Sequence, residues 1–308
     1  MIISTGMRTD IPAFYSKWFI NRLHEGYVCV RNPYRPEQVT KYVLSPDVVD
    51  CITFCTKNPK PMLSHIDELS DYGQFWFVTI TPYGKDIEPN VPPVLDVIES
   101  FKKLSTTIGK NAVSWRYDPI FFGKGFDTNR HIEEFEKIAR KLSGYTDICV
   151  VSFLDLYDKV RRNAVGIYPP EPQQQLLLGK AFAEIGKKYN IGIRSCCESA
   201  KLTDCGIDTS GCQTKATIER AIGQRLTMPK RKNQRGTCDC LLGSDIGAYN
   251  SCGHLCKYCY ANADKETVLK NMALHEIDSP FLIGNYRKGD VITQANQASN
   301  VELQMSLF

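Results

Sequence analysis

Residues 112–153 read AVSWRYDPIFFGKGFDTNRHIEEFEKIARKLSGYTDICVVSF, and this stretch decides the fold. Two short apolar runs, residues 112–117 and 148–153, are typical of buried strands. Between them, residues 128–142 place Ile132, Phe135 and Ile138 at helical spacing. A strand, a helix and another buried strand form a βα repeat, which predicts parallel strands covered by helices.

The same alternation extends over the first two thirds of the chain. Further strands are expected at residues 2–5, 51–56, 75–81 and 191–195, and further helices at residues 11–24 and 173–189. Each unit takes about 35 to 45 residues. We therefore expect an α/β fold with a partial or complete parallel (β/α) barrel of the TIM type. An open doubly wound sheet is the second interpretation.

Three regions are expected along the chain. Residues 1–200 form the βα-repeat barrel region, and residues 201–263 are a cysteine-rich region that completes the barrel. Residues 264–308 form a C-terminal helix, at 265–274, and a flexible tail. A short helix is expected at residues 216–222. The basic run at residues 230–235 either faces phosphates or is a solvated loop.

The composition excludes disorder for most of the chain, because 43% of its 308 residues are hydrophobic and 23% are charged. The formal charge of +4 permits an anionic partner without demanding one. No stretch reaches the roughly 18 to 20 apolar residues of a membrane helix, and the N-terminus has no basic leader. We therefore expect a cytoplasmic protein, in which the crowded cysteines form a metal-binding region rather than a disulfide framework, and any single cysteine is by default a reduced, buried thiol.

Polar residues follow the expected strands, where a barrel builds its active site. They include Ser4, Thr5, Gly6, Arg8 and Asp10 in the first unit, Lys57 and Asn58 in the second, Arg116, Tyr117 and Asp118 in the fourth, and Cys196, Cys197 and Glu198 in the sixth. We expect these residues to line a ligand cavity. For any single one, a cap, a turn or a salt bridge is the alternative role.

Nine of the thirteen cysteines lie between Cys196 and Cys259. Three of them, Cys252, Cys256 and Cys259, are separated by three and two residues in the sequence SCGHLCKYCY. This spacing allows three thiolates to bind three irons of one 4Fe–4S cluster and leaves the fourth iron open for chemistry. A structural zinc site would instead close around four ligands.

The C-x3-C-x2-C spacing with Tyr258 before the last cysteine resembles the radical S-adenosylmethionine superfamily. The resemblance implies that S-adenosylmethionine binds the open iron and is cleaved reductively to a 5′-deoxyadenosyl radical, which abstracts hydrogen from a substrate. It also implies a reductase or flavodoxin-type electron donor. The expected cofactor-binding residues are Ser4, Thr5, Gly6, Arg8, Lys57, Asn58, Arg116, Asp118, Glu198 and Tyr258, and Tyr117 or Cys197 is expected to return a hydrogen atom.

The motif stands late in the chain, whereas most members of that superfamily carry it after the first strand. A circular permutation explains the difference if residues 245–250 supply the strand before the motif and pair with residues 2–5.

Segments along almost the whole chain resemble a bacterial family called domain of unknown function 1848. They are STGMRTDIPAFYS, FCTKNP, WRYDPI, SCCES, NQRGTCDCLLGSDIGAYNSCGHLCKYCYAN and the terminal SLF. The TKNP and RYDP segments are locally similar to spore photoproduct lyase, a radical enzyme that repairs thymine dimers. This similarity favours a nucleic acid or nucleotide substrate.

The remaining cysteines fall into two groups. Cys29, Cys51, Cys55 and Cys149 lie in apolar segments and are expected to be core thiols. Of the others, the expected ligands of an auxiliary iron–sulfur cluster are Cys212, Cys238, Cys240 and one of Cys196 or Cys197, with Cys196 favoured because it follows a strand end. Reduced thiols or a structural zinc site are the alternatives.

The last five residues, Gln304-Met305-Ser306-Leu307-Phe308, resemble the peptide by which bacterial DNA-handling proteins bind the sliding clamp. The alternative is that Leu307 and Phe308 fold back onto the protein. A non-catalytic iron–sulfur or zinc module of DNA metabolism is therefore the second functional hypothesis for the chain.

Overall fold

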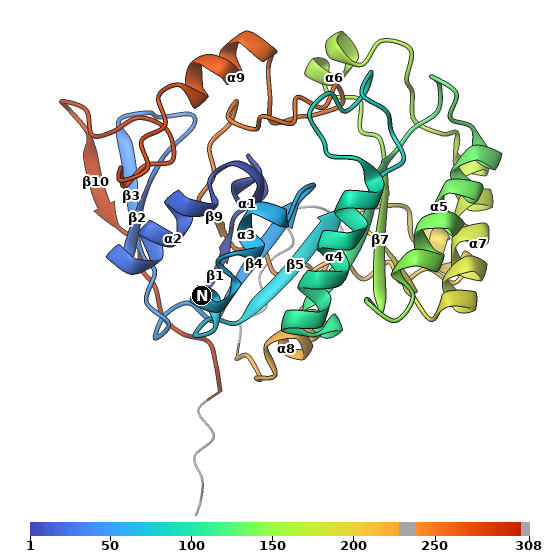
Figure 1. Cartoon of the computed structure of the whole chain (residues 1–308), viewed down its shortest axis with the longest axis horizontal. Helices are drawn as coiled ribbons and strands as arrows, with labels where there is room; N and C mark the ends of the chain where they lie inside the picture. The colour runs from blue at the N-terminus through green and yellow to red at the C-terminus, as the bar shows by residue number, and fades with distance from the viewer. Residues whose placement is uncertain (228–237, 303–308) are drawn as a thin grey trace, which may run out of the picture.

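A computed structural model describes residues 1–227 and 238–302. Its main sheet has seven strands in the order β8-β7-β6-β5-β4-β1-β9, and each neighbouring pair is parallel (Figure 1). The strands are β1 (Ile2–Ser4), β4 (Cys51–Thr56), β5 (Gln74–Thr79), β6 (Val113–Ile120), β7 (Ile148–Phe153), β8 (Gly192–Ser195) and β9 (Ser244–Asp245). From β1 to β8 the order follows the chain without reversal, as in a singly wound sheet.

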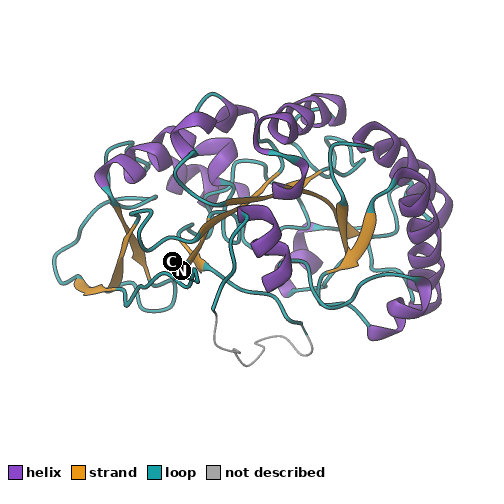
Figure 2. Cartoon of the chain, turned by 90° about the horizontal axis from the view of Figure 1, so that it is seen from below, coloured by secondary structure: helices purple, strands orange, loops and turns teal. Residues whose placement is uncertain are grey.

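Helices cover the main sheet, many of them in an arc along one face, whereas α8 (Lys215–Ile222) lies against the opposite face (Figure 2). They are α1 (Ile11–Phe14), α2 (Ser16–Glu25), α3 (Lys60–Leu63), α4 (Val94–Ile108), α5 (Thr128–Leu142), α6 (Asp158–Asn163), α7 (Pro172–Tyr189), α8 (Lys215–Ile222) and α9 (Lys265–Met272). Within the described ranges, 3-10 turns lie at η1 (Ile66–Leu69), η2 (Lys110–Ala112) and η3 (Ala200–Cys205). No helix in the described ranges is long and apolar enough to cross a membrane.

Alternate residues of each strand point to opposite faces of the sheet. On the face covered by helices, here called the outer face, Trp115 of β6 stacks on Phe135 of α5, which in turn stacks on Phe182 of α7. On the opposite, inner face, Phe75 and Phe77 of β5 belong to a smaller apolar cluster with residues of α8. Nearer the carboxyl ends of β6 and β7, the polar side chains of Arg116, Asp118 and Ser152 form hydrogen bonds with one another.

A second sheet joins distant parts of the chain. It consists of β2 (Tyr27–Arg31), β3 (Gln38–Val43) and β10 (Val291–Gln294), with β10 parallel to β3. The sequence did not predict it, since β10 follows the expected C-terminal helix in the region expected to end in a flexible tail. Residues up to 302 are held in place: Ala298 O accepts a hydrogen bond from the Met1 ammonium at 2.9 Å. The sliding-clamp peptide at residues 304–308 lies outside the described residues.

The strands and helices predicted from the βα repeat are confirmed, with boundary shifts of one or two residues at most ends. The helix expected at residues 11–24 is broken at Tyr15, which has φ −133° and separates α1 from α2. The strand expected at residues 245–250 is only Ser244–Asp245, although it pairs with β1 as expected. In the described residues, β8 and β9 are the edge strands of the sheet.

Candidate functional site

The cysteine motif lies in an irregular segment, residues 251–260, between β9 and α9, which we call the cysteine loop. Its backbone turns at Leu255, which takes the left-handed conformation with φ 56°. Three hydrogen bonds to loop carbonyls fix the turn: Tyr15 Oη donates to Ser251 O at 2.6 Å, and Asn262 and Asn90 donate to the carbonyls of Cys252 and Gly253. The loop is therefore held by Tyr15 between α1 and α2, by Asn90 in the segment after β5, and by Asn262 directly after the loop.

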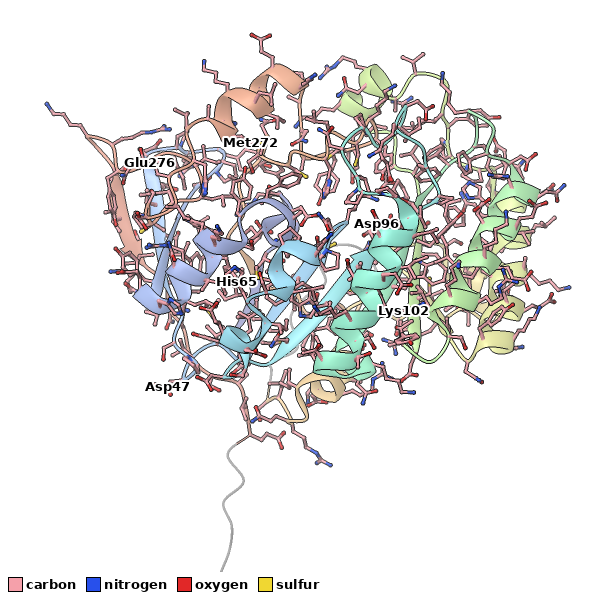
Figure 3. The ribbon with its side chains drawn as sticks, viewed as in Figure 1. Asp47, His65, Asp96, Lys102, Met272 and Glu276 are labelled. Carbon is pink, nitrogen blue, oxygen red and sulfur yellow. The ribbon has the colours of Figure 1, made fainter. Side chains whose placement is uncertain are left out.

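Close packing places the loop against two helices. A Cβ atom on Gly253 would lie 2.7 Å from the Phe14 ring of α1 and 3.2 Å from Met272 Cε of α9. Figure 3 labels Met272, which is the last residue of α9. Only glycine allows so close an approach between the loop and these side chains.

His254 stands inside the motif but does not join the cysteines. Its Nε2 lies 2.9 Å from Asp10 Oδ2, and both side chains are buried. Asp10 also accepts hydrogen bonds from the backbone N–H groups of Ala13 and Lys57, at 3.0 and 2.8 Å. This one carboxylate therefore caps α1 and connects it to the end of β4 and to the cysteine loop.

A buried ion pair lies beside the loop. Lys57 Nζ donates to Glu88 Oε1 at 2.8 Å and to Thr81 Oγ1 at 3.2 Å, and the hydroxyl of Tyr258 donates to the same Glu88 oxygen. Burial is the largest single effect and would lower the pKa of Lys57, but the charges of Glu88, Cys256 and Asp118 and the hydrogen bond to Glu88 together outweigh burial and raise that pKa. The ammonium of Lys57 is thus a fixed positive charge close to Cys256.

The three thiols of the loop fit an iron–sulfur cluster in their chemistry. Burial raises the pKa of Cys252, Cys256 and Cys259, so deprotonation needs a compensating positive charge such as that of bound iron. The backbone N–H of Ala261 donates to Cys259 Sγ at 3.3 Å, a contact that tunes cluster sulfurs in iron–sulfur proteins. In the described residues, no group of three or more Cys, His, Asp or Glu side chains is placed to hold a metal ion as it stands.

A second polar group lies at the ends of β6 and β7. Arg116 Nη2 donates to Asp118 Oδ2 at 2.6 Å, and Ser152 Oγ donates to the other oxygen of Asp118. Glu198 accepts the backbone N–H of Phe153 at 2.8 Å, and burial raises its pKa to about 7. Arg116 and Asp118 thus form one hydrogen-bonded pair, and the charge of Asp118 also acts on Glu198 through space.

The residues after β1 serve the backbone more than a cavity. A Cβ on Gly6 would lie 2.4 Å from Cys55 O, so the turn after β1 packs directly against the backbone of β4. Thr5 is fully buried and Ser4 nearly so. Asn58 accepts the N–H of Lys60 at 3.3 Å and forms a turn before α3, which is the alternative role considered for it.

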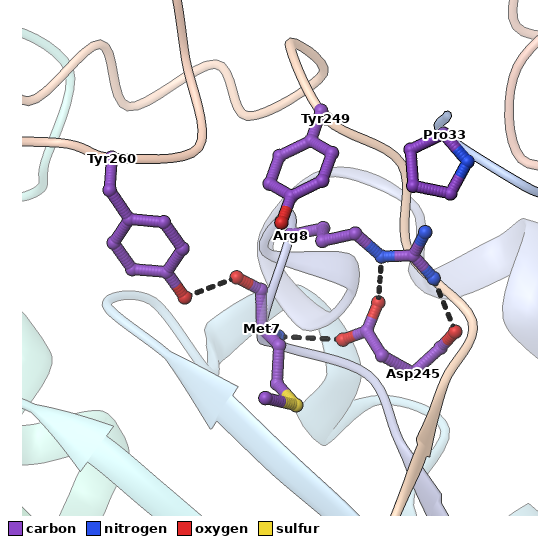
Figure 4. Close-up of a pocket in the computed structure, with 6 residues that line it drawn as sticks. All are labelled: Met7, Arg8, Pro33, Asp245, Tyr249 and Tyr260. Carbon is purple, nitrogen blue, oxygen red and sulfur yellow. Dashed lines mark hydrogen bonds and ion pairs between the residues drawn. The ribbon is translucent and has the colours of Figure 1, made fainter. Parts of the chain in front are cut away.

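Arg8 lines an open pocket of about 260 Å³ with Met7, Pro33, Asp245, Tyr249 and Tyr260 (Figure 4). Arg8 Nε donates to Asp245 Oδ1 at 2.7 Å, and the Tyr260 hydroxyl donates to Met7 O. Because Tyr260 directly follows Cys259, the pocket opens next to the cysteine loop. It offers a guanidinium, a carboxylate and two aromatic rings to a ligand.

The prediction that Tyr117 returns a hydrogen atom to a substrate is wrong. Its side chain lies on the outer face and is fully buried, with its hydroxyl 2.9 Å from His131 Nδ1. Tyr117 precedes Asp118 in β6, and adjacent residues of a strand point to opposite faces. It therefore belongs to the core under α5 and α7 and cannot exchange a hydrogen atom with a ligand in the cavity.

Comparison with known proteins identifies the family. Residues 2–261 match the model of a family described as domain of unknown function (DUF1848). The chain belongs to this family. The DUF1848 match runs from β1 to just beyond Cys259, so the parallel sheet and the cysteine loop belong to one family unit. Among curated proteins, no match to the chain was found.

One solved structure similar to this DUF1848 chain is the 1.80 Å crystal structure of a protein assigned as an alpha-L-fucosidase from Bacteroides thetaiotaomicron VPI-5482. The two are 13% identical with a TM-score of 0.27, over 53% of this chain and 50% of the other. The chain thus spans about half the length of that structure, and so low a score carries no argument.

Several residues of the site in this DUF1848 chain were not predicted from its sequence. Glu88 lies in a loop after β5 and shows no pattern in the sequence, although it pairs with Lys57. Asp245, Tyr249 and Tyr260 line the pocket. The two tyrosines flank the cysteine motif, and this position was the available signal.

Proposed function

We propose that this DUF1848 protein is a radical S-adenosylmethionine enzyme. The observation that supports it best is the placement of Cys252, Cys256 and Cys259 in one anchored loop beside the Lys57–Glu88 pair. Cys252, Cys256 and Cys259 would hold a 4Fe–4S cluster, which with S-adenosylmethionine would supply a 5′-deoxyadenosyl radical for hydrogen abstraction.

The order of the strands favours a permuted partial TIM-like barrel. β9 precedes the cysteine loop and pairs in parallel with β1, at the edge of the sheet opposite β8. If the strands are counted across the sheet from β9 to β8, the cysteine loop follows the first of them. A chain that began at β9 and continued from β1 to β8 would have the same sheet with an N-terminal cluster motif, which is the circular permutation expected from the sequence.

The chain's own residues would divide the work. Asp10 and His254 orient the loop, and the ammonium of Lys57 offsets negative charge at the thiolates. Arg8 and Asp245 form an ion pair that lines the pocket beside Tyr260. The charged end of a ligand would bind to their polar atoms. Arg116, Asp118 and Glu198 offer hydrogen-bonding groups at the neighbouring strand ends.

The proposal also includes a substrate class, an electron donor and a location in the cell. A nucleic acid or nucleotide substrate is favoured by the TKNP and RYDP segments. A flavodoxin-type or reductase donor and a cytoplasmic location complete the proposed setting. The basic run at residues 230–235 lies outside the described residues.

The test is formation of 5′-deoxyadenosine. Anaerobically reconstituted and reduced protein should release it from S-adenosylmethionine, as measured by liquid chromatography with mass spectrometry. Cys256→Ala should abolish the product. Cys205→Ala should not, because this cysteine lies outside the cysteine loop and its thiol donates a hydrogen bond to Leu176 O. No product above the Cys256→Ala background would overturn the proposal and favour a non-catalytic iron–sulfur or zinc module.

A further inference from the structure

A row of sulfur atoms lies apart from the cysteine loop. Cys212 Sγ is 3.6 Å from Cys196 Sγ and also 3.6 Å from Cys240 Sγ. Cys238 continues the row, because its thiol forms a hydrogen bond with Cys240, and it also contacts Cys197. We call Cys196, Cys212, Cys238 and Cys240 the sulfur row.

The sulfur row joins three segments that are distant in sequence. Cys196 directly follows β8, Cys212 lies between η3 and α8, and Cys238 and Cys240 lie before β9. Backbone hydrogen bonds hold the second and third segments together: Asp239 N donates to Ser210 O at 2.9 Å, and Leu241 N donates to Gln213 O at 2.8 Å. The sulfurs therefore meet because the backbone is fixed on both sides.

Two features of the backbone suit sulfur as a ligand. Gly211 has φ 134°, and a Cβ there would lie 2.8 Å from Cys240 Sγ and 3.3 Å from Cys238 Sγ, so only glycine leaves room for both sulfurs. The backbone N–H of Gln213 donates to Cys240 Sγ at 3.4 Å. Such N–H···S contacts stabilise thiolates at metal sites.

Positive charge is also at hand. The guanidinium of Arg116 acts on both Cys196 and Cys212 through space. Four thiolates around one divalent ion leave a net charge of about −2, which a buried cation offsets. Arg116 would therefore offset part of the charge of a thiolate site, while its ion-pair partner Asp118 acts on Cys196 with the opposite sign.

We propose that the sulfur row binds one tetrahedral zinc-type ion. With Zn–S bonds of about 2.3 Å, neighbouring sulfurs of a tetrahedral site lie about 3.8 Å apart. The two measured separations of 3.6 Å are close to this spacing. The ligands of a 4Fe–4S cluster bind four different irons and stand well beyond contact, so the spacing disfavours the auxiliary cluster expected from the sequence.

Binding requires a local adjustment. The sulfurs form a row rather than a closed cage, and no such group in the described ranges is already placed around one metal position. Rotation of the half-buried Cys238 would close the cage, and the bound thiols would release their protons. The ion would fix the chain between β8 and β9, the two edge strands of the main sheet.

The experiment uses the full chain carrying Cys252→Ala, Cys256→Ala and Cys259→Ala, so that its outcome is independent of the proposed function. Chelator-treated, reduced protein is titrated with cobalt(II) and then with zinc(II). We expect one cobalt per chain with the visible absorption of a tetrahedral thiolate site, displaced by one zinc. Adding Cys212→Ser should lower cobalt affinity by at least tenfold, whereas Cys205→Ser should leave it unchanged.

A conservative variant separates ligand loss from misfolding. Cys240→His keeps a ligand and should retain binding with weaker sulfur-to-cobalt absorption. Absence of binding in the titrated protein, or equal binding after Cys212→Ser, would overturn the proposal. It would also be overturned if iron analysis found four additional irons per chain that Cys212→Ser removes. A Cys196–Cys212 disulfide, found by mass spectrometry in protein purified under reducing conditions, would overturn it as well.

Discussion

His254 Nε2 lies 2.9 Å from Asp10 Oδ2, which joins the cysteine loop to the first helix of the chain across 244 positions of sequence. Both side chains are buried, and the same carboxylate accepts the backbone N–H groups of Ala13 and Lys57. The loop that follows the last strand of the sheet is thus positioned by a residue that follows the first.

Asp10→Ala removes this link. We expect a loss of stability of about 2–4 kcal/mol, from about 1 kcal/mol for the helix cap and about 1–3 kcal/mol for the unpaired buried His254. Urea unfolding measures it. The matched control is Asp127→Ala, which removes the cap of α5 and should cost about 1 kcal/mol. Equal losses in the two variants would show that the histidine contact contributes nothing.

Glu88→Gln leaves the ammonium of Lys57 without its buried partner. Because the Glu88 side chain is 2% exposed and that of Lys57 13%, we expect a destabilisation of about 3–5 kcal/mol. Thermal and urea unfolding provide the measurement. Glu99→Gln breaks an exposed pair with Lys102 and should change stability by less than about 0.5 kcal/mol. A Glu88→Gln protein as stable as this control would contradict the prediction.

Gly6→Ala tests whether the turn after β1 is a backbone contact. The added methyl would lie 2.4 Å from Cys55 O and must push the turn after β1 away from β4, which should cost about 1–3 kcal/mol in unfolding free energy. Gly192→Ala, where the methyl would lie 3.4 Å from Asp147 O, is the control and should be nearly neutral. Similar stability for both proteins would mean that the strands have room to spare.

Asp50 gives a pH dependence to the last described segment. Burial alone would raise the pKa of Asp50, but hydrogen bonds from the Met1 ammonium, Ser299 and Asn300 outweigh it and lower that pKa. The stabilisation is therefore complete above the unfolded-state pKa of about 3.9 and is lost as pH falls through the lower folded-state pKa.

The variant Asp50→Asn isolates this contribution. The difference in urea-unfolding free energy between wild type and Asp50→Asn should be constant near neutral pH and should shrink below about pH 4. Asp147→Asn, which breaks a more exposed pair with Lys110, provides the comparison. A difference that grows on acidification would show that the sign of the pKa shift is wrong.

The sequence by itself determined the parallel sheet, because alternating apolar runs and amphipathic stretches are local patterns that a packed sheet must satisfy. It also marked Cys252, Cys256 and Cys259, since their spacing along the chain is itself the signal. In the short second sheet, β10 (Val291–Gln294) escaped prediction because it is exposed along its whole length and carries no apolar alternation.

Only the tertiary structure decided which polar residues meet. Tyr117 and Asp118 are adjacent in sequence but point to opposite faces, and Glu88 reaches Lys57 from a loop without any pattern. The sulfur row depends on Cys196, Cys212 and Cys240 coming together from separate segments. Such contacts are fixed by the packing and registration of distant elements, and spacing along the chain does not encode them.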